Sequence, residues 1–499
     1  MRFKTRIVAC LAVWMAVVLA GCTGTPQGLP SASDDLVVGA TAEPPTLDAT
    51  SNDAAAIPQV MLYNVYQTLV KLDGNGAFQP LLATAWKVSS DNLTYTFTLD
   101  RRANFAGGRA LTAKDVVWSI HRVQRSGVKV LKAQMAVVAS AVATDEHTVT
   151  VKLTKPSNQW LFTMTQTAGM VFDSTKTDFA SATAGSGPYA VTSWTKGASL
   201  VLTQRSDYWA TKPQFGTVTF RYFSDPNAMN ASMLSGDLDI ISNLQAPQAI
   251  DQFADPSRFT VIDGTTNGEV VMSFNFQTKA LQDKRVRQAI SYAIDRKALL
   301  QTVWNNKGTL IGSMVPPTDP WYSDLSNTYP YDPAKAKQLL AEAGYGPGKL
   351  RLRLRLPTLP YATASGQFVA SALKDVGINV VTDELEFPAR WLDVVFTKAD
   401  YDMSIIAHVE PRDIVKYGQP GYYWRYNNPR VQKLLVEADE GSADQQITDM
   451  KKVAKILADD AVADWLFLLP NLVITKRDIT GLPKNATGLS FDLSQVARS

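Results

Sequence analysis

The chemically most promising stretch of the chain runs from Tyr401 to Asn427. Its first part, residues 403–406, is apolar without a helical face, which predicts a buried strand. The titratable side chains that follow this strand are His408, Glu410, Arg412 and Asp413. Pro411 breaks the strand, so these groups lie on a loop. Because ligands usually meet a sheet where its strands end, we expect this loop to contact a ligand.

An aromatic cluster follows the loop at Tyr422, Tyr423 and Trp424. Aromatic rings supply contact area at a small entropy cost, so we expect some of these three side chains to form walls of a binding site. The alternative is that they belong to the hydrophobic core, and we expect this for at least one of them. Trp391 fits either role.

Enzyme chemistry finds little support in the sequence. The three histidines are His121, His147 and His408. The first two fit a helix face and an exposed strand start. No G-x-S-x-G elbow, phosphate-binding loop or H-E-x-x-H motif occurs. The H-x-E pattern at His408 resembles that of zinc deaminases but lacks their cysteine pair. We therefore expect no enzymatic activity, and an extracellular hydrolase is the least favoured alternative.

Length and charge restrict the class of protein further. With 499 residues, 45% hydrophobic and 19% charged, the chain predicts a globular protein of roughly two to four units. The formal charge is +3, and three of the 49 basic residues lie within the first six positions. Without them, 46 basic residues balance 46 acidic ones. This balance argues against a nucleic-acid partner.

Residues 1–22 are typical of an export signal. Basic residues precede an apolar run over 7–20, which is too short for a membrane span. The run ends in Leu19-Ala20-Gly21-Cys22, which resembles the bacterial lipobox. We therefore expect a lipid on Cys22, the loss of Cys10 with the leader, and no disulfide. Residues 23–35, rich in Gly, Pro, Ser and Thr, predict a flexible tether.

The rest of the chain mixes strand and helix patterns. Alternating apolar residues predict strands at 36–40, 93–99, 147–153, 189–194, 200–204, 218–223, 238–241, 270–276, 350–356 and 378–382. Helical spacing predicts helices over 59–72, from 113 onward, 227–234, 283–303, 333–343, 362–376 and 444–457. From about Thr265 the two alternate, which indicates an α/β fold.

The order of several segments resembles that of the solute-binding lipoproteins of bacterial ABC importers, in particular the dipeptide- and oligopeptide-binding family (family 5 extracellular solute-binding proteins). The segments that carry the resemblance are 62–70, 80–86, 111–120, 185–189, 235–240, 285–296 and 331–337. Each segment is weak alone, but their order and spacing extend from about Leu36 to beyond Leu466.

The resemblance implies an α/β, two-lobed periplasmic-binding-protein-like fold with a hinge and an extra subdomain on the first lobe. Lobe I would comprise residues 36–73, 185–264 and 476–499, and lobe II residues 268–474. The extra subdomain of lobe I would be 74–184. The chain would cross between the lobes near 263–268 and again near 473–476. Gly264 and Gly268 suit the first crossing because glycine tolerates large dihedral changes.

The resemblance also implies a function. The protein would capture peptides between its lobes and deliver them to an ABC permease in the membrane. It would act as a monomer without a cofactor, lipid-anchored to the cell membrane and facing the periplasm or cell exterior. By their place in the family's pattern, Glu43, Asn64 and Tyr66 would approach the ligand from lobe I.

One departure from the family concerns the charged loop. Peptide binders of this family usually carry Trp and then an Asp that meets the peptide's amino end. Here no Trp follows the strand, and the acid is either Glu410 or Asp413, with Asp413 slightly preferred. Arg412 would suit an anionic group. The alternative is therefore a carrier of a non-peptide ligand, namely heme, a metal chelate or another anionic solute.

Overall fold

The structure is a computed structural model that describes residues 34–180 and 185–499. The predicted export signal, Cys22 and nearly all of the tether 23–35 lie outside these residues. Within the described ranges, none of the helices is both long enough and apolar enough to cross a membrane.

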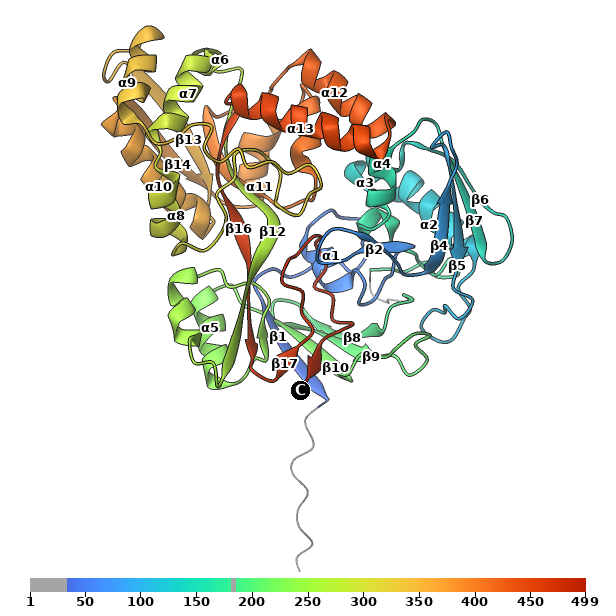
Figure 1. Cartoon of the computed structure of the whole chain (residues 1–499). Helices are drawn as coiled ribbons and strands as arrows, with labels where there is room; N and C mark the ends of the chain where they lie inside the picture. Colours follow the sequence, from blue (N-terminus) through green and yellow to red (C-terminus); the bar gives the residue numbers. More distant parts are fainter. Residues whose placement is uncertain (1–33, 181–184) are drawn as a thin grey trace, which may run out of the picture. The chain divides into compact units, whose positions relative to one another are not determined.

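A ten-stranded sheet runs through the body of the protein (Figure 1). Its strands, from one edge to the other, are β14 (Ile378–Leu385), β13 (Leu350–Pro357), β15 (Met403–His408), β12 (Phe259–Phe274), β16 (Ala463–Lys476), β11 (Ile240–Ile241), β1 (Asp35–Ala40), β10 (Thr217–Tyr222), β9 (Ser199–Gln204) and β8 (Tyr189–Thr195). The strands predicted from alternation are present, and β12 begins eleven residues earlier than its predicted start, Val270.

Strands β12 and β16 connect the two halves of the sheet (Figure 1). Their pairing is irregular between Thr265 and Glu269, which lie opposite Pro470 and Leu468. Residues 473–476, the second proposed crossing, pair with residues 259–262, directly before the first proposed crossing. Gly264 is needed for close packing, because a Cβ there would lie 1.7 Å from the carbonyl oxygen of Lys484. Its φ is not positive, unlike the tight-turn glycines.

The β15 half of the sheet is packed between helices. They are α7 (Lys284–Ala293), α8 (Arg296–Trp304), α9 (Pro333–Glu342), α10 (Pro360–Asp375), α12 (Pro429–Glu440) and α13 (Ala443–Asp459). The single helix predicted over 283–303 is wrong. Ile294 is extended, and the carboxylate of Asp295 then accepts hydrogen bonds from Lys297 N and Ala298 N, which starts α8 as a separate helix.

The other half carries α5 (Pro226–Ser235) and a separate four-stranded sheet. That sheet is formed by β4 (Ala83–Val88), β5 (Thr94–Leu99), β7 (Thr148–Leu153) and β6 (Val138–Ala143), with α2 (Ala113–Ser126), α3 (Lys129–Met135) and α4 (Asn158–Thr163) beside it. As predicted, α2 starts at Thr112, whose backbone N–H donates to the Asp115 carboxylate at 2.9 Å. One apolar core cluster, from Leu69 to Val171, belongs to this unit.

The helix predicted over 59–72 is wrong as well. Helix α1 covers only Ala56–Met61, and strand β2 (Val70–Leu72) closes the segment. Tyr63 has a φ of +67°, and its backbone N–H donates to the carbonyl of Tyr66 at 2.8 Å. A residue in the left-handed conformation ends a right-handed helix. The helix therefore stops here, although the helical spacing of apolar side chains continues.

Helices α4 and α12 cap each other: each supplies a side chain that forms hydrogen bonds at the end of the other. The carboxylate of Asp439, in α12, accepts hydrogen bonds from Ser157 Oγ and Gln159 N at the start of α4. In return, Asn158 Nδ2 donates to the carbonyls of Ala438 and Gly441 at the end of α12. The extra subdomain and lobe II are therefore in direct contact in this structure.

Candidate ligand site at the end of strand β15

His408, the last residue of β15, anchors a buried polar network. Its Nδ1 lies 2.9 Å from Asp413 Oδ2, and its Nε2 lies 3.0 Å from the hydroxyl of Tyr423. That hydroxyl also lies 2.8 Å from Ser273 Oγ on β12. Because a carboxylate can only accept, the Nδ1 proton points to Asp413. Both ring nitrogens of His408 are therefore hydrogen-bonded, and the network holds the loop against the sheet.

Glu410 lies two residues further along, and its side chain is exposed to solvent. The surrounding protein and the neighbouring Asp413 charge raise the pKa of its carboxyl. Ligand atoms of His408, Glu410 and Asp413 all lie within 4.8 Å of one another. This spacing can hold a cation, either an ammonium group or a metal ion. Since Asp413 is buried and Glu410 is exposed, the structure favours Glu410 as the first contact.

Two further carboxyls face this loop from elsewhere in the chain. Glu269 stands opposite His408 in the β12–β15 pairing and is only 2% exposed. Burial, and then the charges of Asp413, Asp319 and Glu410, raise its pKa well above its usual value. Burial raises the pKa of Asp319 to about 6, against a lowering effect of Arg412. Oε2 of Glu269 and Oδ2 of Asp319 have no hydrogen-bond partner among the described residues.

Arg412 is buried between aromatic rings rather than directed into solvent. Its guanidinium carbon lies 3.8 Å from the ring centre of Phe162 and 4.8 Å from that of Trp321. Phe162 belongs to α4 of the extra subdomain, so this contact joins the loop to the other lobe. Burial lowers the pKa of Arg412 to about 10. Its backbone is left-handed, with φ of +64°, which turns the chain after Pro411.

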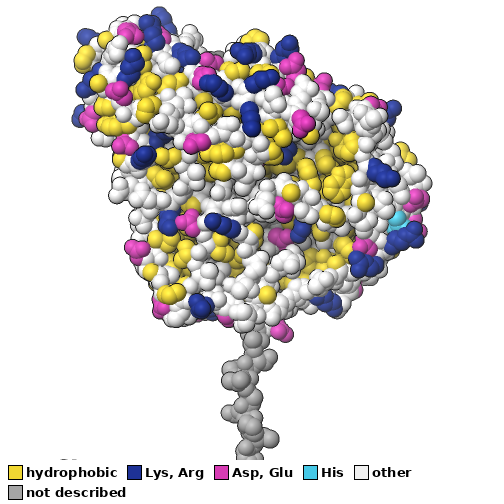
Figure 2. Space-filling model, in the orientation of Figure 1, with side chains coloured by type: hydrophobic (Ala, Val, Ile, Leu, Met, Phe, Trp, Pro, Cys, Tyr) yellow, Lys and Arg dark blue, Asp and Glu magenta, His cyan; other side chains and the backbone are white. Residues whose placement is uncertain are grey.

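A small cavity opens beside Arg412 and is lined from both lobes. Its lining comes from distant parts of the chain and includes Gly76, Phe162, Asn267, Asp319, Arg412 and Thr487. Its volume is about 10 Å³, which is room for about one water molecule. Hydrophobic side chains gather near the middle of the face drawn in Figure 2, where the surface is hollowed. A solute larger than water therefore cannot occupy this cavity unless the lobes separate.

The aromatic cluster divides into one accessible ring and two core rings. Trp424 is fully buried and stacks on Tyr417 at 4.1 Å, and Tyr423 is 1% exposed. Tyr422 is half-buried and lies edge-on to Phe396. Only Tyr422 has surface to offer a ligand. Trp391 is also core, with its indole N–H donating to Ser404 Oγ at 3.1 Å.

The three side chains predicted from lobe I are used internally. Asn64 is fully buried, donates to the carbonyls of Val60 and Phe491, and accepts from Leu493 N. Tyr66 is also fully buried, with its ring 4.7 Å from that of Phe172. Neither side chain offers surface to a ligand in this structure, and the hydroxyl of Tyr66 has no hydrogen-bond partner among the described residues.

Glu43 has a structural role of a different kind. Its two carboxylate oxygens accept hydrogen bonds from the indole N–H of Trp194 at 2.6 Å and from Gly197 N at 2.8 Å. The carboxylate therefore fixes the turn between β8 and β9. The structure does not bring Glu43 to the cluster around His408.

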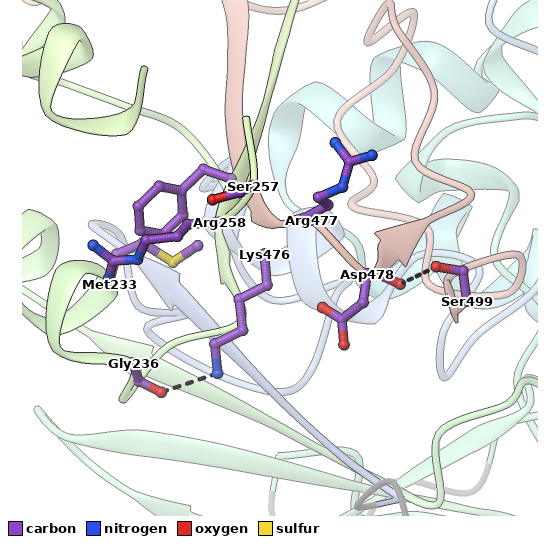
Figure 3. A pocket seen from close by; sticks show the side chains of 9 residues that line it. Met233, Gly236, Ser257, Arg258, Lys476, Arg477, Asp478 and Ser499 are labelled. Atoms are coloured by element: carbon purple, nitrogen blue, oxygen red, sulfur yellow. Dashed lines mark hydrogen bonds between the residues drawn. The ribbon is translucent and has the colours of Figure 1, made fainter. Parts of the chain in front are cut away.

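A much larger groove, of about 720 Å³, lies elsewhere on lobe I (Figure 3). Three of its basic side chains, Arg258, Lys476 and Arg477, donate to the backbone carbonyls of Leu234, Gly236 and Pro256. None of the residues predicted to bind a ligand lines it. Size alone would select this groove, but its cations already have partners. Near the β15 loop, by contrast, Oε2 of Glu269 and Oδ2 of Asp319 have no partner among the described residues.

Sequence reasoning missed the members of the site that come from other segments, namely Glu269, Asp319, Phe162 and Trp321. Of these, only Glu269 gave a signal: it is the one acid at the head of the apolar run 270–274. An acid in that place is costly unless it has a function or a partner.

Comparisons with known proteins agree on one family. The profile of the bacterial extracellular solute-binding proteins, family 5 (Middle), matches residues 77–434. Over 483 residues the chain is 28% identical to the probable D,D-dipeptide-binding periplasmic protein DdpA of Escherichia coli, covering 91% of this chain and 92% of that protein.

Solved structures share the fold. The periplasmic binding protein DppA of Helicobacter pylori, in complex with the peptide STSA, superposes with a TM-score of 0.80 at 20% identity over 93% of this chain and 98% of that chain. NikA of Brucella suis, in complex with Fe(III)-EDTA, gives a TM-score of 0.83 at 20% identity, over 93% of this chain and all of that chain (100%). These matches establish the two-lobed fold.

Proposed function

We propose that this chain, which belongs to the bacterial extracellular solute-binding proteins of family 5, captures peptides between its lobes and delivers them to an ABC importer. The family consists of extracellular solute-binding proteins, which supports binding rather than catalysis as the function of this chain. The ligand class rests on the relatives, because DdpA is named for dipeptides and DppA of H. pylori is solved with a peptide.

The observation that carries the proposal is the loop after β15. The exposed carboxylate of Glu410 lies next to a buried pair, His408 and Asp413, and Arg412 of the same loop contacts Phe162 of α4. A peptide enclosed there has an ammonium group that loses its hydration, and a carboxylate restores the lost interaction. Tyr422 supplies an accessible aromatic surface beside it.

A carrier of heme, a metal chelate or another anionic solute is the second candidate, since NikA of B. suis is solved with Fe(III)-EDTA. The charge of the site disfavours it. Four carboxyls lie around the loop, and an anion would be repelled by those of them that are ionised. His408 is committed to Asp413 and Tyr423, so it is not free to ligate an iron or nickel ion.

Native mass spectrometry of the freshly purified protein tests the ligand class. We expect bound species with peptide masses that disappear on partial unfolding and dialysis. A heme absorption band, or a stoichiometric metal chelate in place of peptide, would contradict the proposal.

Anchoring through a lipid on Cys22 completes the proposal, together with action as a monomer. It rests on the apolar run that ends in Leu19-Ala20-Gly21-Cys22. Replacing Cys22 with Ser should release the protein from membranes or block its processing. A Cys22→Ser variant that is processed normally and stays membrane-bound would exclude the lipid anchor.

A further inference from the structure

The carboxyls around the β15 loop outnumber the cations that act on them. The four acids are Glu269, Asp319, Glu410 and Asp413, which influence one another electrostatically. The permanent cations among them are Arg412, which acts on Asp319, and Lys416, which acts on Glu410. When all four carboxyls are ionised, their negative charges exceed the positive charges of these two cations by two.

Part of this excess negative charge belongs to buried carboxyls rather than to a solvated surface. Glu269 is nearly inaccessible, yet its Oε2 has no hydrogen-bond partner in the described chain. Its position on β12, directly opposite His408 on β15, directs it at the loop. A buried carboxyl oxygen without a partner is costly, so its presence at this place indicates that a partner arrives from outside.

The existing cations do not fill that place. Arg412 lies over the rings of Phe162 and Trp321, and its Nε has no partner among the described residues. The Nζ atom of Lys416 lies over the ring of Tyr422, 5.9 Å from the ring centre. Both cations therefore contact aromatic rings at the sides of the cluster.

We propose that the end of the ligand at this cluster carries two positive charges, as in a peptide whose free amino terminus belongs to a lysine or arginine. This inference rests on the proposed function, since it assumes that a peptide enters with its amino end at the loop. One charge would meet Glu410 and Asp413, and the second would meet Glu269. Binding would displace any protons held by these carboxyls, because a nearby cation favours their charged form.

Titration calorimetry with three synthetic peptides tests the inference. Lys-Ala-Ala and Ala-Ala-Lys have equal net charge but place the second ammonium at opposite ends, and Ala-Ala-Ala lacks it. We expect Lys-Ala-Ala to bind the ligand-free protein about tenfold or more tightly than either of the others. Repeating the titration in buffers of different ionisation enthalpy should show more protons released by Lys-Ala-Ala than by Ala-Ala-Ala.

Two variants localise the preference. Glu269→Gln should reduce the advantage of Lys-Ala-Ala to within about twofold, whereas Glu384→Gln, at an exposed acid on β14, should leave it unchanged. Equal binding of all three peptides overturns the inference but not the proposed function. Failure of all three to bind overturns both. Tight binding of Zn²⁺ alone, in competition with Lys-Ala-Ala, would reassign the cluster to a metal ion and overturn the dicationic ligand.

Discussion

Two regions of this protein carry polar and aromatic residues of the kinds that bind ligands, and the structure uses them in opposite ways. In the segment 62–66 of lobe I, both polar atoms of the Asn64 side chain are hydrogen-bonded to backbone, either of helix α1 or of the C-terminal tail. In the loop 408–413 of lobe II, Glu410 is exposed, and the nearby Glu269 has an oxygen without a partner. Residue type alone therefore does not mark the ligand site, because Glu410 keeps a polar group accessible to a ligand whereas Asn64 does not.

Replacing Glu410 with Gln should have the largest effect on ligand binding. Loss of one partner of an enclosed charge pair leaves the other charge buried, at a cost of roughly 2–5 kcal/mol. This corresponds to about a thirtyfold or greater loss of affinity for the co-purified peptide in titration calorimetry.

The matched control is Glu43→Gln, at an acid whose oxygens hold Trp194 and Gly197. Its affinity should remain within about twofold of the parent, because it changes only a structural contact of lobe I. If the two variants bind equally well, or if Glu43→Gln is the weaker binder, the comparison between the two regions is wrong.

Replacing Asn64 with Ala should affect stability instead of binding. It removes three hydrogen bonds and leaves the carbonyl of Phe491 and the N–H of Leu493 without their partner. We expect unfolding in urea to require roughly 2–4 kcal/mol less free energy, with peptide affinity unchanged. Asn243→Ala, at an exposed position, should leave the free energy of unfolding within about 0.5 kcal/mol of the parent value. A selective loss of affinity in Asn64→Ala would restore Asn64 as a ligand contact.

A smaller effect, dependent on pH, is expected at Glu269. Its pKa is higher in the folded than in the unfolded state, so the folded state holds this proton more tightly. The stabilisation is present below the unfolded pKa and is lost as pH rises through the folded pKa. In the ligand-free protein, Glu269→Gln should therefore raise the free energy of unfolding by roughly 1–3 kcal/mol at pH 8 and change it little near pH 4. An equal effect at both pH values would show that the Glu269 charge is not responsible.

Much of the fold could be predicted because its signals are local. Alternating residues identified β5, β7 and β13, and the Thr112 cap identified the start of α2. The helix predictions over 59–72 and 283–303 failed where backbone conformation overrides spacing. A positive φ at Tyr63 and an extended Ile294 followed by an Asp295 cap interrupt apolar patterns that otherwise continue.

The site could be predicted only as far as it is contiguous in sequence. His408, Glu410 and Asp413 lie within six positions and come together as expected. Glu269 and Asp319 reach them through strand pairing and a distant loop, and Phe162 arrives from another lobe. No spacing within one segment encodes these contacts, because they depend on which strands pair and on how the lobes meet.

The most direct test of the account compares free and N-acetylated forms of the peptide that co-purifies with the protein. If the carboxylates at the end of β15 bind the ligand's amino group, acetylation should weaken binding to the parent by about thirtyfold or more in titration calorimetry. The same acetylation should cost the Glu410→Gln variant far less. Equal affinities of the parent for the free and acetylated peptides would contradict the claim that this loop recognises the charged end of the ligand.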